Sequence, residues 1–127
     1  MTPNTILVVD DDADMRESLR EALDGEGYTV RVASNGKEAI DLLLRSKPPR
    51  GIILDVAMPV MTGPAFYRAM RAVPTLADIP VVMLTSNPTA APNGLPVMKK
   101  PVTLKQLLAV VDQFLGRPPP FAPTTAP

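Results

Sequence analysis

Residues 6–12 read ILVVDDD, four aliphatic residues followed at once by three aspartates. A continuous run of Ile, Leu and Val predicts a strand buried on both faces, as in a parallel sheet. The aspartates end that strand, and apolar residues at helical spacing follow directly, over residues 13–23. The start of the chain therefore predicts a β-α unit of an α/β fold.

The alternation of strand and helix patterns continues along the chain. Further strands are predicted over residues 28–32, 52–54, 80–84 and 95–99. Right-handed crossovers place helices on both faces, so we expect a doubly wound, five-stranded parallel sheet. Three later helices have apolar positions that we expect in the core: Ala39, Ile40, Leu43 and Leu44 in the first, Phe66, Ala69, Met70 and Val73 in the second, and Leu104, Leu107, Leu108, Val111 and Leu115 in the last. The last helix is expected to begin after an N-cap at Thr103 and to end before Gly116.

Two segments depart from this alternation. Residues 87–96 contain three prolines and a glycine, a composition that resists any helix longer than one turn. Residues 117–127 are rich in proline and are expected to be disordered or polyproline-like, as a tail or a linker. A length of 127 residues suits one domain, which we assign to residues 1–116.

Composition excludes several classes of chemistry and partner. The 13 basic and 13 acidic residues balance, so no excess positive charge attracts nucleic acid. Histidine and cysteine are both absent, which excludes disulfides, thiolate metal sites and the commonest general base. No secretion signal and no apolar run of membrane-spanning length is found, so we expect a cytoplasmic protein without a membrane partner.

Polar residues stand where four of the predicted strands end. Asp10 and Asp11 follow the first strand, Asp55 the third, Thr85 the fourth and Lys100 the fifth. Ligands of an open parallel sheet bind at these carboxyl ends. Clustered carboxylates raise one another's pKa, and an oxygen-only donor set suits Mg²⁺ as the compensating cation. A carboxylate beside that ion can attack phosphorus, with the lysine and the hydroxyl contacting the transferred phosphoryl group.

Four segments of this sequence resemble the signature regions of response-regulator receiver domains. They are VVDDD at 8–12, LDVAMPVMTG at 54–63, MLTS at 83–86 and KKP at 99–101. The resemblance extends over residues 5–116 and is specific, because the four segments occur in the family's order at strand ends. It implies a flavodoxin-like sheet with strand order 2-1-3-4-5 and a single-domain chemotaxis-regulator-like architecture.

The resemblance also implies roles for individual residues. Asp10, Asp11, Asp55 and the main-chain carbonyl of Ala57 would form the magnesium site, with Asp11 as a direct ligand. Asp55 would accept phosphate from a sensor histidine kinase or a phosphotransfer protein. Thr85 would be the switch hydroxyl and Lys100 the phosphate-contacting lysine, followed by a cis peptide bond to proline. Neighbouring residues are expected to have structural roles, namely Asp12 at a helix start, Lys99 on the surface, and Met58, Pro59 and Gly63 in the turn after Asp55.

The family resemblance implies a signalling switch and not an enzyme acting on separate substrates. Such a domain catalyses its own phosphorylation and slow dephosphorylation, and signals to a downstream protein by a conformational change. Two features differ from the family pattern: residues 87–96 leave no room for a full fourth helix, and Val97 stands where the family commonly has an aromatic residue. These differences affect the usual output surface and leave the acceptor site intact.

Three other functions compete with this interpretation. A phosphorylation-independent binding module is the main alternative, because of the altered connection at residues 87–96. An aspartyl phosphohydrolase usually carries a second aspartate two residues after its nucleophile, where this chain has Ala57. A nucleotide-binding flavodoxin-like protein would need a phosphate loop after the first strand, and none is present.

Overall fold

The computed structural model describes residues 4–58, 60–87 and 95–112. Within these residues, five strands form one sheet in the order β2-β1-β3-β4-β5, and every neighbouring pair is parallel. The strands are β1 (Thr5–Val9), β2 (Thr29–Ala33), β3 (Gly51–Asp55), β4 (Val81–Thr85) and β5 (Val97–Lys99). Both the five-stranded parallel sheet and its strand order are confirmed.

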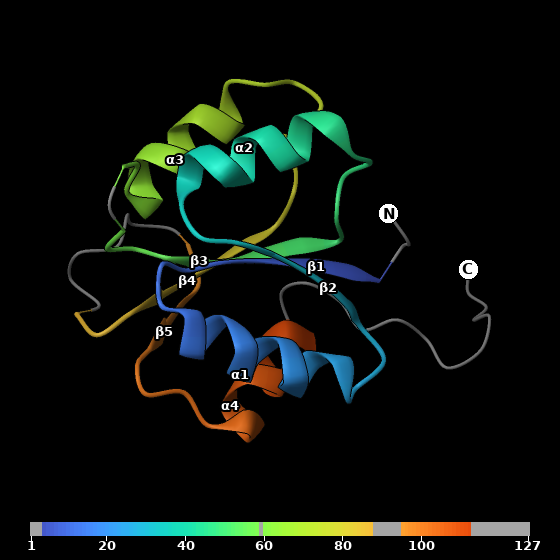
Figure 1. Cartoon of the computed structure of the whole chain (residues 1–127), viewed down its shortest axis with the longest axis vertical. Coiled ribbons are helices and arrows are strands. Elements are labelled where there is room, and N and C mark those ends of the chain that lie inside the picture. The colour runs from blue at the N-terminus through green and yellow to red at the C-terminus, as the bar shows by residue number, and fades with distance from the viewer. Residues whose placement is uncertain (1–3, 59, 88–94, 113–127) are drawn as a thin grey trace.

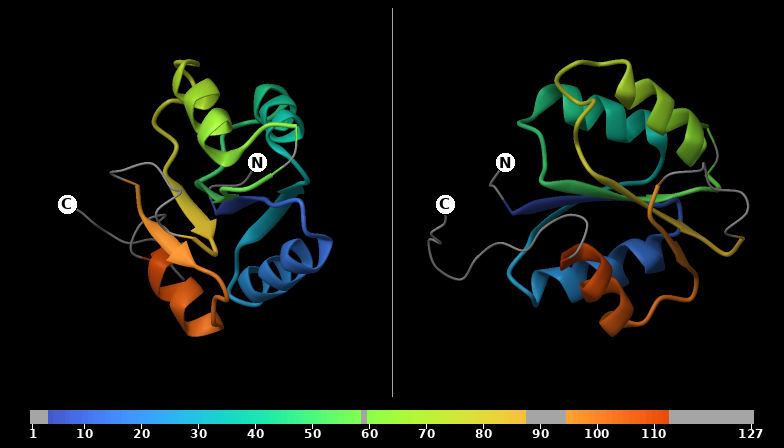
Figure 2. Two further views of the ribbon diagram at one scale, coloured as in Figure 1. Left: turned by 90° about the vertical axis from the view of Figure 1, so that its left-hand side faces the viewer. Right: turned by 180° about the vertical axis from the view of Figure 1, so that it is seen from behind.

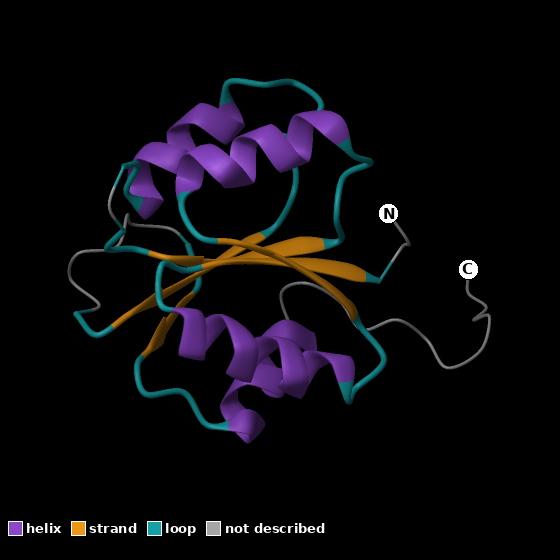
Figure 3. Ribbon diagram, viewed as in Figure 1, coloured by secondary structure: helices purple, strands orange, loops and turns teal. Residues whose placement is uncertain are grey.

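Helices cover both faces of the sheet, as a doubly wound fold requires. They are α1 (Ala13–Asp24), α2 (Gly36–Arg45), α3 (Gly63–Arg71) and α4 (Leu104–Val110). Figure 1 shows α2 and α3 on one face and α1 and α4 on the other. The two views in Figure 2, from the side and from behind, and the colouring in Figure 3 show the same three layers of helix, sheet and helix. None of the helices in the described part of the chain is both long and apolar enough to cross a membrane.

Each helix begins at a side chain that accepts hydrogen bonds from its first turn. Asp12 accepts from the main-chain N–H groups of Asp14 and Met15, which confirms its expected structural role. Thr103 is the N-cap of α4, also as predicted, and it forms a capping box with Gln106. Such a cap typically contributes about 1 kcal/mol to helix stability.

Among the described residues, the core consists of two apolar clusters, one on each face of the sheet. Strands β1, β3 and β4 are buried along their whole length, which accounts for their continuous aliphatic sequence. Two leucines expected in the core are exposed instead, Leu44 by 60% and Leu104 by 54%. Leu44 lies about 100° around the helix from the buried Leu43 and so points to solvent. Leu104 lies on the same face of α4 as Leu107. It is the first residue of the helix, so its side chain has no preceding helical turn to pack against.

Some element boundaries also differ from the prediction. The second strand begins at Thr29, and Tyr28 is a buried residue before it. Helix α3 ends at Arg71, so Val73 packs against the core from the segment that follows the helix. The end of the last helix at Leu115 and Gly116, the boundary at residue 116 and the proline-rich tail all lie outside the described residues.

The connection from β4 to β5 comprises residues 86–96. Its described residues, 86–87 and 95–96, contain no helical turn. The remaining residues, 88–94, lie outside the described part. The prediction that the fourth helix is missing or reduced concerns mainly these residues and therefore also falls outside it. Four helices are found in the described part of the chain, and none of them lies between β4 and β5.

Glycines permit two close contacts beside the loop that follows β3. A Cβ atom on Gly63 would lie 2.4 Å from the Asp55 carbonyl oxygen. A Cβ atom on Gly36 would lie 2.8 Å from the Met61 Cγ, so the methionine packs directly on the start of α2. The expected structural role of Gly63 is thereby confirmed, and Met58 is buried in the same loop. Pro59 lies outside the described residues.

Candidate functional site

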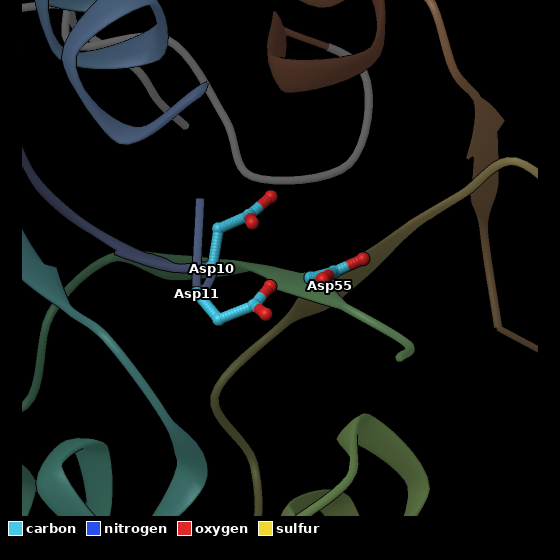
Figure 4. Close-up of side chains that lie close together, drawn as sticks. All are labelled: Asp10, Asp11 and Asp55. Carbon is cyan, nitrogen blue, oxygen red and sulfur yellow. The ribbon is translucent and has the colours of Figure 1, made fainter. Parts of the chain in front are cut away.

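Three carboxylates meet at the carboxyl edge of the sheet. Asp10 and Asp11 follow β1, and Asp55 ends the neighbouring strand β3. One oxygen from each carboxylate lies within 4.8 Å of the others, a spacing at which they could hold a metal ion. Figure 4 shows the side chains of Asp10 and Asp11 extending from the end of β1 toward the side on which Asp55 lies. The parallel sheet therefore gathers these residues as the sequence predicted.

Lys100 brings a positive charge to the same cluster. Its Nζ donates to Asp10 Oδ2 at 3.2 Å and to Asp55 Oδ1 at 3.1 Å. Its main-chain N–H donates to the Thr85 carbonyl at 2.8 Å, which fixes the residue directly after β5. The peptide bond to Pro101 is cis, as predicted. The lysine thus reaches across the end of β4 and bridges two carboxylates that come from different strands.

The electrostatics of the cluster follow from its burial. Asp10 is 0% and Asp55 4% exposed. Burial raises the pKa of Asp55, and the nearby negative charge of Asp10 raises it further, while Lys100 opposes both effects. Burial alone would lower the pKa of Lys100, but its contacts with Asp55 and Asp10 outweigh that effect and raise it. The lysine therefore stays charged at neutral pH, and the cluster still has an excess of negative charge.

The hydrogen bonds leave particular oxygens available. Asp10 Oδ1 accepts from the Asp12 N–H at 2.9 Å, and Asp10 Oδ2 is bound to Lys100. Asp55 uses Oδ1 for the lysine, and within the described part of the chain no donor reaches its Oδ2. Asp11 is exposed, and no described residue donates to its carboxylate. Carboxylate oxygens of this kind are the ligands that a hard ion such as Mg²⁺ prefers. The donor set therefore fits the predicted ion.

Thr85 lies beside the cluster but its hydroxyl is engaged elsewhere. It ends β4, next to β3, and is 5% exposed. Its Oγ1 donates to the Asn87 carbonyl at 3.1 Å and accepts from the Asn87 N–H at 3.0 Å. These bonds form a local turn of the kind that Thr side chains favour. The predicted phosphate contact of this hydroxyl would therefore require the turn to open.

The structure also places three further residues that the sequence analysis named. Ala57 lies in the exposed turn directly after β3, two residues beyond Asp55, and its role as a carbonyl ligand stays a prediction. Val97 is half-buried at the start of β5 and packs against the core cluster that includes Met83. Lys99 is exposed, in agreement with its expected place on the surface.

One residue at this edge was missed by sequence reasoning. Arg16, in α1, donates from a guanidinium N–H to the main-chain carbonyl of Asp10 at 2.8 Å. The helical pattern assigns Arg16 to an amphipathic helix and gives no sign of this contact, because a bond from a side chain to the main chain leaves no periodic signal.

Comparison with known proteins agrees with this geometry. Residues 6–112 match the family model described as the response regulator receiver domain. The chain belongs to this family. The response regulator MprA of Mycolicibacterium vanbaalenii is 38% identical over 125 residues, which cover 93% of this chain and 53% of that protein. The chain thus spans about half the length of the curated relatives it matches.

Solved receiver structures have the same fold as this domain. Chemotaxis protein CheY4 of Vibrio cholerae has a TM-score of 0.79 at 28% identity, over 88% of this chain and 98% of that one. The receiver domain of the sensor histidine kinase PA1611 from Pseudomonas aeruginosa has a TM-score of 0.80 at 23% identity, over 91% and 99% of the two chains. That structure is described with a magnesium ion coordinated in its active site cleft.

Proposed function

We propose that this receiver domain is a phosphorylation switch whose acceptor is Asp55. The observation that carries the proposal is the Lys100 ammonium, which bridges Asp10 and Asp55. It engages Asp55 Oδ1 and leaves Oδ2 without a donor from the described residues, in a cluster that also contains Asp11. A buried carboxylate with one oxygen held and the other available is oriented for attack on a phosphorus atom. The positive charge beside it suits a phosphoryl group that arrives with negative charge.

Asp10, Asp11 and Asp55 would hold Mg²⁺, together with the Ala57 carbonyl. When bound, the ion supplies charge neutralisation for the transferred phosphoryl group and a fixed geometry for its oxygens. The support from this chain is the group of three carboxylates beside a single lysine, together with oxygens on Asp11 and Asp55 that receive no donor from the described residues. The magnesium ion described in the Pseudomonas receiver domain occupies the active site cleft of the same fold.

The donor would be a phosphohistidine of a sensor kinase or of a phosphotransfer protein in the cytoplasm. Asp55 Oδ2 forms a bond to phosphorus while the P–N bond of the donor breaks, and the electron pair stays on the imidazole nitrogen. Lys100 neutralises the new phosphoryl oxygens as a point charge. The Thr85 hydroxyl, once released from Asn87, donates to one of them. The domain then acts on a downstream protein as a switch, and slow hydrolysis of the acyl phosphate resets it.

Labelling with a small phosphodonor tests this proposal. Acetyl phosphate and Mg²⁺ should modify the wild-type domain, giving a mass increase of one phosphoryl group in intact-protein mass spectrometry. Asp55→Asn should reduce labelling to background, because the attacking oxygen is replaced by an amide. Asp41→Asn, an exposed aspartate in α2, is the matched control and should label normally. Labelling that persists in Asp55→Asn would show that the acceptor lies elsewhere.

A phosphorylation-independent binding module is the second candidate. The observation in its favour is the Thr85 hydroxyl, which is already satisfied by both main-chain groups of Asn87. A domain held in this state would bind its partner whether or not Asp55 is modified. Partner capture from the native cytoplasm, with and without beryllofluoride and Mg²⁺, separates the two functions. Capture that depends on beryllofluoride supports the switch, and equal capture supports the module.

A further inference from the structure

Arg16 contacts the main chain on both sides of Asp11. Its guanidinium donates to the carbonyl of Asp10 at 2.8 Å, and its own N–H donates to the carbonyl of Asp12 at 3.0 Å. The first contact comes from the side chain and the second from the helical turn that begins α1. The helix fixes Asp12, as it would with another residue at position 16, whereas the guanidinium of Arg16 anchors Asp10, the residue before Asp11.

Asp11 depends on such anchoring more than its neighbours do. The Asp10 carboxylate is fixed by the Asp12 N–H and by Lys100, and the Asp12 carboxylate is fixed by the first turn of α1. The Asp11 carboxylate is exposed and receives no donor from the described residues. Its direction toward Asp55 is consequently set by the main chain around it.

The positive charge of Arg16 and its hydrogen bond to the main chain should have opposite effects on the affinity for Mg²⁺. A guanidinium near the acidic cluster repels a divalent cation, so loss of the charge alone would tighten cation binding. Loss of the anchor would weaken cation binding, because Asp11 would sample more directions and lose entropy on coordination. The sign of the effect therefore distinguishes the two roles.

We propose that Arg16 is a positioning residue that holds Asp11 in the direction required for Mg²⁺ binding. The proposal rests on the proposed function, in which Asp11 is a metal ligand. The Arg16 side chain would act through the main chain of Asp10. The bond to the Asp12 carbonyl comes from the main-chain N–H of residue 16 and is retained when the side chain is replaced. Residues that orient a metal ligand in this way commonly change metal affinity about 10-fold or more when they are replaced.

The test is the affinity of the unphosphorylated protein for Mg²⁺, measured by titration calorimetry. Arg16→Ala should weaken binding roughly 10-fold, and Arg16→Lys, which keeps one donor and the charge, should give an intermediate value. Arg45→Ala is the matched control, because Arg45 donates from Nε to a main-chain carbonyl, that of Asp41, at 3.1 Å within α2. This variant loses the same kind of bond away from the site and should bind Mg²⁺ like the wild type.

Each outcome decides the proposal. Unchanged or tighter binding in Arg16→Ala overturns it, and so does equal weakening in Arg45→Ala, which would indicate a general loss of helix stability. Thermal unfolding without Mg²⁺ checks that the variants fold. If Arg16→Ala does not fold, the affinity of Arg16→Lys for Mg²⁺ is the deciding measurement, and a wild-type affinity in Arg16→Lys overturns the proposal. A wild-type protein that binds no Mg²⁺ refutes the metal site itself, whereas normal wild-type binding with an unaffected Arg16→Ala refutes only the role of Arg16.

Discussion

The acidic cluster of Asp10, Asp11 and Asp55 and the hydroxyl of Thr85 lie at the same edge of the sheet but are held in different ways. Lys100, which is 90 and 45 residues away in sequence, bonds Asp10 and Asp55. Thr85 is bonded to Asn87, only two residues away. Tertiary structure therefore fixes the acceptor side, whereas a local turn fixes the switch side. Opening a local turn costs little free energy, so a conformational change can begin at Thr85 more easily than at the acidic cluster.

The rigidity of the acceptor side is tested most strongly at Gly63. In Gly63→Ala the new Cβ would lie 2.4 Å from the Asp55 carbonyl oxygen and 2.9 Å from the Val56 Cα, both main-chain atoms of the core. We expect the free energy of unfolding to fall by about 3 kcal/mol, measured by urea denaturation. Gly25→Ala is the control, because its Cβ would meet nothing closer than 3.4 Å and its φ is −63°. A neutral Gly63→Ala would mean that the acceptor side yields as easily as the turn at Thr85.

The ion pairs of Lys100 should have the next largest effect. Lys100→Met leaves the buried carboxylates of Asp10 and Asp55 without a cation, and we expect a loss of about 2–3 kcal/mol in Mg²⁺-free buffer. Mg²⁺ should restore more stability to this variant than it adds to the wild type, because the ion replaces the missing charge. Thermal unfolding with EDTA and with Mg²⁺ measures both effects. The exposed Lys99→Met should respond like the wild type, and an identical response in Lys100→Met would argue that the ion pairs contribute little.

Asp55→Asn should stabilise the domain when Mg²⁺ is absent. Burial and then the charge of Asp10 raise the pKa of Asp55, so its ionised form is less favourable in the folded than in the unfolded state. Wild-type stability should decrease as pH rises from the ordinary aspartate value of 3.8 through the raised folded-state value. Above that window we expect the variant to unfold at a temperature higher by about 2–5 °C, and near pH 3 the difference should vanish. A lower unfolding temperature at neutral pH would mean that the bond to Lys100 outweighs burial.

The smallest effect is expected on the switch side. Thr85→Val removes the two hydrogen bonds to Asn87 and should cost only about 0.5–1 kcal/mol, since the turn is local. Labelling of Asp55 by acetyl phosphate should persist, while beryllofluoride should no longer shift the NMR amide signals of Asn87 and Leu95. Ser86→Ala, next to it and exposed, is the control. Loss of labelling in Thr85→Val would show that the two sides are not separable.

The sequence predicted the sheet and the acidic cluster for related reasons. Continuous aliphatic strands such as residues 52–54 mark burial on both faces, and right-handed crossovers then restrict the topology. The carboxyl ends of neighbouring parallel strands meet, so the sequence alone groups Asp10, Asp11 and Asp55.

Other features left no periodic signal. Helical spacing identifies an apolar face but not how far a partner covers it, so Leu44 and Leu104 were wrongly expected in the core. The Arg16 side chain reaches the main-chain carbonyl of Asp10, six residues earlier in the sequence, and no capping or turn motif signals this contact, so it was not foreseen.

The contact of Met61 with Gly36 places a thioether sulfur between the loop after β3 and the start of α2. A Cβ at position 36 would lie 2.9 Å from that sulfur, so the thioether fits there only because glycine has no side chain. Oxidation of Met61 to the sulfoxide would add a polar oxygen at this contact and push the loop away from α2. Peroxide could therefore disturb the segment that carries Ala57 without modifying any of the carboxylates.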